Sequence, residues 1–264
     1  MSSAKNPASS VAADRAENSL TLVVPRVTDH GMPFSPAAGA MNRSLHNSLT
    51  SAVYGMTICV LVVAIASSLS AQPSRRALFN GKDLDGWQQA GPGSFVVKDG
   101  MMKTEGGMGI LWYTREKIAH ATIRVVFKLT AKESDSGVFI RIPEKPTEPW
   151  MPINRGYEVE IGDWPDDYSC TGVLYTFTKA LARPIKPLGE WNTMDITIDG
   201  ARTIVHLNGI KVTDFTEGQT VPGKPRGSHD PDRGPRPDSG FIGLQNHPGS
   251  EVYFREVSIT RASR

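Results

Sequence analysis

The stretch ATIRVVFKLT, residues 121–130, decides the fold of this chain. Apolar side chains occupy every second position from Ala121 to Leu129, and mostly polar ones lie between them. Successive side chains of a β-strand point to opposite faces, so this alternation predicts a strand with one buried face. Residues 193–198 repeat the pattern.

Further short segments have the composition of strands, and no segment shows a sustained helical period of apolar residues. The dipeptides Asp99-Gly100, Asp199-Gly200 and Asn208-Gly209 separate apolar runs and are typical of tight hairpin turns. We therefore expect an all-β chain folded as an antiparallel two-sheet jelly-roll sandwich. The additional predicted strands lie at 95–97, 101–104, 110–112, 137–142, 157–161, 172–175, 203–207 and 241–246.

Two irregularities are also predicted near the C-terminal end. Val252 and Phe254 share one strand phase, whereas Val257 and Ile259 share the other, which indicates a β-bulge near residues 255–256. Residues 218–239 are dense in Pro and Gly and predict a long loop, which either lies in solvent or belongs to a binding site.

The N-terminal third differs in composition from the rest. Residues 1–40 are rich in Ala, Ser and Pro and predict a disordered leader. Residues 41–71 have the basic start, apolar stretch (56–66) and small-residue end of a secretory signal peptide, with translation starting at Met41. The apolar stretch is shorter than the roughly 20 residues that a membrane span needs. We expect export to the periplasm or beyond, no stable membrane anchor, and a single domain over 72–264.

The charge and cysteine content limit the classes of partner and the disulfide bonds that we expect. The 264 residues carry 29 Lys and Arg against 27 Asp and Glu, a net charge of +2 that gives no electrostatic case for nucleic acid. Cys59 lies inside the predicted signal peptide, so Cys170 would stand alone in the mature chain without a disulfide. A small-molecule partner fits this balance better than a polyanion does.

The acidic stretch RGYEVEIGDW, residues 155–164, is the strongest chemical signal. On a strand, Glu158 and Glu160 point to the same face with Cα atoms about 6.6 Å apart. Two such charges would not be tolerated in an apolar core, so this face must be a wet cleft or open solvent. In a cleft, the pair would titrate at separate pH values and could supply an acid and a base.

Other candidate residues share strand faces with small glycines. Arg141 has the same strand phase as Gly137, which predicts a cation beside the glutamates. Further along the chain, Gln245 and His247 also share one strand phase. Trp150 and Trp164 lie in Pro-flanked loops, where exposed rings could stack on a sugar. The candidates for substrate binding are Asp163, Tyr157, Tyr175, Gln245, Trp150 and Trp164.

Several segments together resemble the 3-keto-disaccharide hydrolase family. They follow the family's order over nearly all of residues 78–260, and the resemblance implies a concanavalin A-like jelly roll. This chain has Asp135 and Glu160 where the family usually has Asn and Gln. The matching segments are LFNGKDLDGW (78–87), SGVFIR (136–141), GYEVEI (156–161), TGVLY (171–175), GEWN (189–192), LNG (207–209), GLQNH (243–247) and VYFR (252–255).

The resemblance implies cleavage of 3-keto-glycosides by removal of the C2 proton, loss of the aglycone and addition of water. Glu158 or Glu160 would then be the base, Arg141 would stabilise the enolate, and His247 would protonate the leaving oxygen. A divalent metal (Ca²⁺, Mn²⁺ or Mg²⁺) held by the carboxylates and His247 could replace Arg141 in that role. No other cofactor is expected.

Two other functions fit the same residues. The acidic stretch is similar to the strand motif of laminarinase-type endo-β-glucanases, in which the outer carboxylates, here Glu158 and Asp163, act as nucleophile and acid/base. The fold would also suit a secreted lectin-like module without catalysis. Convergence of titratable groups on one face would favour an enzyme, whereas aromatic residues alone would favour binding.

Overall fold

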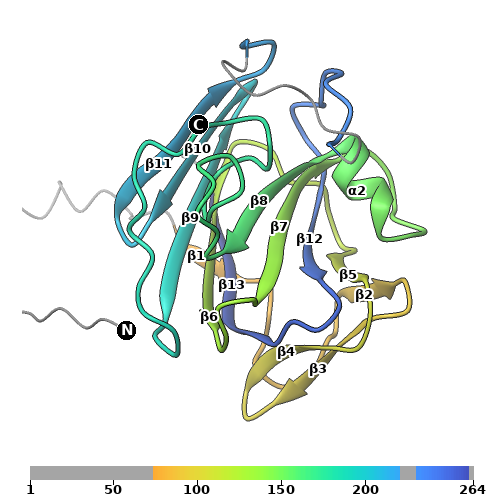
Figure 1. The fold of residues 1–264 in the computed structure, drawn as a ribbon. Helices are drawn as coiled ribbons and strands as arrows, with labels where there is room; N and C mark the ends of the chain where they lie inside the picture. The colour runs from red at the N-terminus through yellow and green to blue at the C-terminus, as the bar shows by residue number, and fades with distance from the viewer. Residues whose placement is uncertain (1–73, 221–229, 262–264) are drawn as a thin grey trace, which may run out of the picture. The chain divides into compact units, whose positions relative to one another are not determined.

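The computed structural model describes residues 74–220 and 230–261, so the predicted leader and signal peptide lie outside the described residues. The described chain forms two antiparallel β-sheets and one short helix, α2 (Trp150–Arg155) (Figure 1). The prediction of an all-β, two-sheet sandwich is confirmed. No helix in the described part of the chain is long and apolar enough to cross a membrane.

The larger sheet is built around the stretch that opened the sequence. Strand β6 (Ala121–Leu129) pairs with β9 (Asn192–Asp199) and β13 (Val252–Arg261), so it is hydrogen-bonded on both edges. The path through this sheet is β11 (Ile210–Thr216), β10 (Arg202–Leu207), β9 (Asn192–Asp199), β6, β13 (Val252–Arg261), β4 (Met101–Glu105) and β3 (Ser94–Lys98), with β1 (Arg75–Ala77) also pairing β13.

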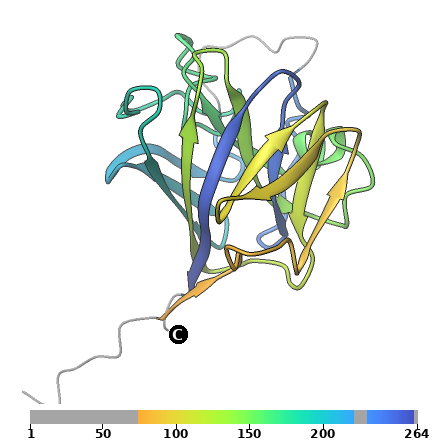
Figure 2. The same cartoon turned by 90° about the horizontal axis from the view of Figure 1, so that it is seen from below.

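The smaller sheet carries the acidic stretch at one edge. Its order is β2 (Trp87–Ala90), β5 (Gly109–Tyr113), β12 (Phe241–Asn246), β7 (Asp135–Ile142) and β8 (Tyr157–Gly162). Figure 2 shows the molecule turned by 90°. Helix α2 precedes β8 directly and contacts β7 and β8.

Apolar side chains fill the space between the two sheets. Ile123, Val125 and Phe127 of β6 and Val159 and Ile161 of β8 are fully buried in this main core. Each such side chain stabilises the fold by roughly 1.5–3 kcal/mol relative to an exposed one. A second, smaller apolar cluster (Ile110, Trp112, Phe139, Ile142 and Ile153) lies apart from the main core.

The predicted turns and bulge are present. Asp99 and Gly100, and Asn208 and Gly209, all have positive φ, as the tight turns between paired strands require. The register of β13 against β6 shifts between Phe254 and Glu256, which confirms the bulge.

One predicted strand is absent. Residues 172–175 form turns and make only an isolated bridge, between Leu174 and Val159. Gly172 has a φ of +92°, which takes the chain out of the extended conformation.

Candidate active site

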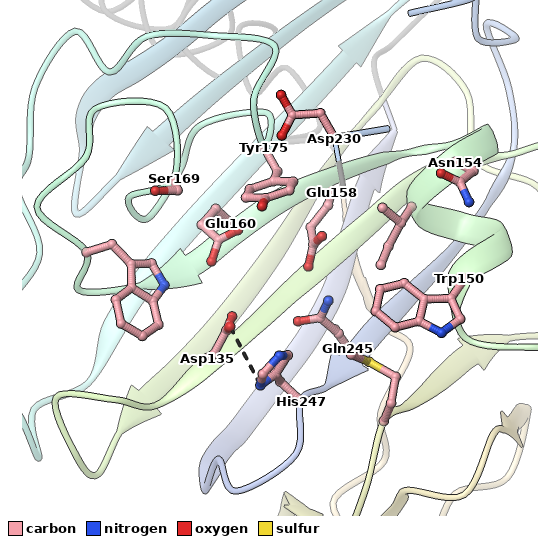
Figure 3. Close-up of a pocket in the computed structure, with 13 residues that line it drawn as sticks. Asp135, Trp150, Asn154, Glu158, Glu160, Ser169, Tyr175, Asp230, Gln245 and His247 are labelled. Atoms are coloured by element: carbon pink, nitrogen blue, oxygen red, sulfur yellow. Dashed lines mark ion pairs between the residues drawn. The ribbon is translucent and has the colours of Figure 1, made fainter. Parts of the chain in front are cut away.

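A pocket of about 690 Å³ opens on the smaller sheet, on the side that carries Glu158 and Glu160. Its size is in the usual range for small-molecule sites. Figure 3 shows Glu158, Glu160, Asp135 and Gln245 around a common space, with Trp150 on α2 at one side and Ser169 at the other. The described lining residues are Met108, Asp135, Trp150, Ile153, Asn154, Glu158, Glu160, Trp164, Ser169, Tyr175, Asp230, Gln245 and His247.

Strand alternation places the two glutamates. In β8, Val159 and Ile161 point into the main core, so Glu158 and Glu160 point to the opposite face. Both side chains are nevertheless nearly buried, with 6% and 3% of their surface exposed. Burial raises the pKa of each carboxyl well above its ordinary value, and the other nearby carboxyls raise it further. The face is a cleft and not open solvent.

A glycine on the neighbouring strand makes room for Glu158. Gly137 of β7 pairs with Glu160, and a Cβ at this glycine would lie 2.3 Å from Oε1 of Glu158. Any larger residue at position 137 would therefore displace that carboxyl. Among the described residues, Oε1 of Glu158 has no hydrogen-bond partner. This buried oxygen is therefore left unsatisfied within the described chain.

Asp135 connects Glu160 to His247. The carboxyls of Asp135 and Glu160 are hydrogen-bonded, and Nδ1 of His247 lies 3.7 Å from Oδ2 of Asp135 (Figure 3). Burial raises the pKa of Asp135, whereas the nearby imidazole lowers it. Two carboxyls in contact cannot both stay ionised at low cost, so Asp135 and Glu160 titrate as a pair.

Tyr175 and Gln245 supply neutral polar groups. The backbone N–H of Tyr175 donates to the carbonyl oxygen of Glu158, which fixes the tyrosine beside β8. Burial, and then the charges of Glu160 and Glu158, raise the pKa of Tyr175 to about 12, so its O–H remains a donor. In the described chain, the buried Oε1 atom of Gln245 has no hydrogen-bond partner.

Two tryptophans flank the polar groups. Trp150 begins α2 and is 54% exposed, with its backbone N–H donating to Glu148. Trp164 follows the end of β8 and is half-buried. Its indole lies so close to Gly162 that a Cβ there would be 2.3 Å from the ring nitrogen. The two rings offer flat apolar surface on the pocket wall.

Arg141 does not line the pocket, so its prediction from strand phase was wrong. Phe139 and Ile142 both belong to the second apolar cluster, although strict alternation would put them on opposite faces. The chain shifts register between them, and Arg141 has a φ of +56°, which turns its side chain away from the glutamates. A Cβ on Gly240 would lie 2.2 Å from the backbone of Arg141, so the glycine allows the shift.

The Arg141 guanidinium is instead a structural group. It is fully buried and donates to the carbonyl oxygens of Gly200 (2.7 Å) and Pro237 (2.9 Å) and to the hydroxyl of Thr203. Asp238 lies 3.6 Å away and offsets its charge. Arg141 thus joins the β9–β10 turn to the segment before β12.

Two further sequence candidates lie elsewhere. Tyr157 precedes Glu158 and so points into the main core, where its hydroxyl donates to Glu217 and its ring packs against Phe177. Asp163 follows the end of β8, is exposed, and does not line the pocket. The laminarinase-type pairing of Glu158 with Asp163 therefore has no geometric basis.

The pocket also contains residues that the strand patterns did not indicate. Ser169 comes from the irregular segment between β8 and β9, and Ile153 and Asn154 come from α2, neither of which has a sequence period. In the sequence, Asp135 stands out only as a departure from the resembled family. Within residues 74–220 and 230–261, no three His, Cys, Asp or Glu side chains are grouped to hold a metal ion.

The sequence was compared with known families. The model of the 3-keto-alpha-glucoside-1,2-lyase-like domain matches residues 74–260. The chain belongs to this family. No curated protein matches the sequence.

Solved structures agree with the family on the fold. Two crystal structures of candidate glycosyl hydrolases from Parabacteroides distasonis ATCC 8503 each share 26% identity, with a TM-score of 0.60 over 72% of this chain. The match covers 94% of one of those chains and 100% of the other. A Bacillus subtilis protein of unknown function with a galectin-like fold matches at 14% identity and a TM-score of 0.51, over 72% of this chain and 96% of its own. The family match and the likeness to candidate glycosyl hydrolases support a carbohydrate-active function.

Proposed function

We propose that the protein cleaves 3-keto-glycosides by elimination across C1 and C2, followed by addition of water. The observation that best supports this proposal is the pair of buried carboxyls, Glu158 and Glu160, facing a pocket in a domain of this family. A carbonyl at C3 acidifies the hydrogen on C2. The C–H electron pair then forms an enolate, which expels the oxygen on C1, and water adds at C1 of the resulting enone while a proton returns to C2.

Glu158 is the better of the two candidate bases. Its Oε1 atom has no hydrogen-bond partner in the described chain, whereas the Glu160 carboxyl is engaged with that of Asp135. The raised pKa of Glu158 makes its carboxylate a stronger base than an ordinary glutamate. The proton taken from C2 would rest on Glu158 until water has added.

Neutral donors replace Arg141 in stabilising the enolate oxygen. The hydroxyl of Tyr175 and the amide of Gln245 line the pocket with Glu158, and both can donate to an oxyanion. His247 lies at the open side, with 40% of its side chain exposed, and is placed to protonate the leaving oxygen. Asp135 would orient that imidazole through the 3.7 Å contact.

The remaining alternative is a lectin-like module without catalysis. The described pocket combines seven sequence candidates, among them Glu158, Glu160 and His247, and adds Asp135. Convergence of so many titratable groups, three of them with raised carboxyl pKa values, is typical of catalytic sites. A sugar-binding face needs aromatic surface but gains nothing from buried carboxyls in contact.

Product analysis tests the proposal. The protein is incubated with 3-keto-trehalose, a 3-keto-glucoside and the parent glycosides, with and without a chelator. We expect 3-ketoglucose from the keto substrates only, with no effect of the chelator. Glu158→Gln should lower kcat/KM by about 100-fold or more, whereas Glu133→Gln, an exposed matched control, should not. Binding without turnover would indicate a lectin, and full turnover by both Glu158→Gln and Glu160→Gln would refute the carboxylate mechanism.

A further inference from the structure

The wall of the pocket formed by α2 is more apolar than the other walls. Helix α2 and the residue before β5 contribute Met108, Trp150, Ile153 and Asn154 to the lining, and their polar groups are the Asn154 amide and the Trp150 indole N–H. The carboxyls come instead from β7 and β8 and from Asp230. Figure 3 shows Trp150 on the opposite side of the pocket from Ser169.

This apolar wall is continuous with buried apolar structure. Ile153 is 7% exposed and belongs to the second apolar cluster, together with Trp112 and Phe139. Trp150, by contrast, exposes 54% of its surface, which is unusual for so large an apolar side chain beside a pocket. An apolar ligand group that covered this indole would remove both surfaces from water.

Both ends of α2 are fixed. At its start, Gly91 lies against Pro149 so closely that a Cβ on the glycine would be 2.5 Å from the proline ring. At its end, the Arg236 guanidinium donates to the carbonyl oxygens of Asn154 (2.9 Å) and Gly156 (3.0 Å). A six-residue helix without a side-chain N-cap would otherwise be poorly held.

Arg236 is itself held by aromatic rings. It is 6% exposed, and its guanidinium lies 5.2 Å from the ring centre of Tyr157 and 5.1 Å from that of Phe177. These contacts anchor it in the main core beside β8, within cation–π distance of both rings. The last described part of the Pro-rich segment thus braces the helix that carries Trp150.

We propose that the α2 wall is a leaving-group subsite for a flat apolar aglycone, such as an aryl group, and that Arg236 is a positioning residue that holds it. This inference rests on the proposed function. Among its described residues the wall offers stacking surface but only one amide and one indole N–H, so it suits an aryl group better than a second sugar, whose hydroxyls need several partners.

Substrates of matched leaving-group acidity test the subsite. The 2-phenylethyl and methyl 3-keto-glucosides both release simple alcohols, so a difference in kcat/KM reports contacts with the phenyl ring and not bond strength. We expect the 2-phenylethyl compound to be favoured by about 10- to 100-fold. It should also be favoured over 3-keto-trehalose. The parent 2-phenylethyl and methyl glucosides, compared by calorimetry, give the same preference in binding without chemistry.

Variants assign the preference to the wall. Trp150→Ala should bring the ratio of the two kcat/KM values close to one, whereas Trp191→Ala, a matched change outside the pocket, should leave the ratio unchanged. Arg236→Met should lower the ratio mainly through KM, and Arg236→Lys should lower it less. In the Trp150→Ala background, Arg236→Met should have no further effect on the ratio, which a purely structural role would not predict.

The outcomes separate the two proposals. If no 3-keto-glycoside is turned over, the proposed function fails, but calorimetry with the parent glucosides still tests the subsite. A wild-type ratio near one, a preference for 3-keto-trehalose, or a ratio that Trp150→Ala leaves intact would overturn the subsite. An unchanged ratio in Arg236→Lys and Arg236→Met would overturn the role of Arg236. If Arg236→Met does not fold, the lysine variant decides that point.

Discussion

Replacement of Gly137 by Ala tests the catalytic role of Glu158 without touching Glu158 itself. The added methyl carbon would lie 2.3, 2.7 and 2.9 Å from three atoms of the glutamate side chain, Oε1, Cγ and Cδ. Ordinary contact distances are well above 3 Å, so the carboxyl would have to move by about 1 Å. A misplacement of that size costs about 100-fold in rate.

The same change should leave the fold intact. Gly137 does not have a positive φ, so its backbone conformation is open to alanine. Such a replacement stabilises a protein by about 0.4–1 kcal/mol through the unfolded state, which offsets part of the cost of moving one side chain. We therefore expect kcat/KM for a 3-keto-glucoside to fall about 100-fold, with an unfolding free energy within about 1 kcal/mol of wild type.

The assay needs a matched glycine and a double variant. Gly234→Ala adds the same methyl where nothing lies within 4 Å, and it should retain full activity. In a Glu158→Gln background, Gly137→Ala should cause little further loss, because the group that it displaces no longer acts as a base. Full activity of Gly137→Ala, with urea denaturation showing a folded protein, would refute the assignment of Glu158.

Three further outcomes are expected. Arg141→Met should lower the unfolding free energy by roughly 2–4 kcal/mol, because buried carbonyl oxygens lose their donor. The kcat/KM per folded molecule, measured after urea titration, should stay within a few-fold of wild type. A large loss of kcat/KM in folded protein would instead show that Arg141 acts in the site. Because the pKa values of Glu158 and Glu160 are raised, the native state binds more protons than the unfolded one. The unfolding free energy should therefore fall as pH rises from about 4.5 through those values. Glu160→Gln should flatten this fall, and an equally steep profile in that variant would contradict the assignment of the raised pKa. Mass spectrometry of the exported protein should find an N-terminus near residue 72, and a mature chain that still carries Met1 would exclude the signal peptide.

Strand alternation predicted much of the fold and the centre of the site. It identified β6 and β9 and placed Glu158 and Glu160 on one face, because those strands are regular and one face of each is buried. The order of strands within each sheet did not follow from the sequence, because it depends on pairings between residues far apart in the chain.

The errors have identifiable physical causes. Arg141 was misplaced because arginine is not a residue type that indicates a positive φ, whereas the Asn208-Gly209 dipeptide is typical of a turn with positive φ. Asn154 and Ser169 were missed because they lie on a six-residue helix and an irregular segment, where no periodicity exists to read. Tyr157 was assigned to the site although its neighbour Glu158 already implied the opposite face.

The two faces of β8 have separate roles, so substitutions on one face need not disturb the other. Tyr157, Val159 and Ile161 pack in the main core, whereas Glu158 and Glu160 line the pocket. Substitutions at the even positions can therefore alter chemistry while the packing that holds the sheets together stays untouched. In saturation mutagenesis of this strand, substitutions at odd-numbered positions should mainly lower the expression level, whereas substitutions at even-numbered positions should mainly change turnover. New substrate preferences can be selected here on a constant scaffold.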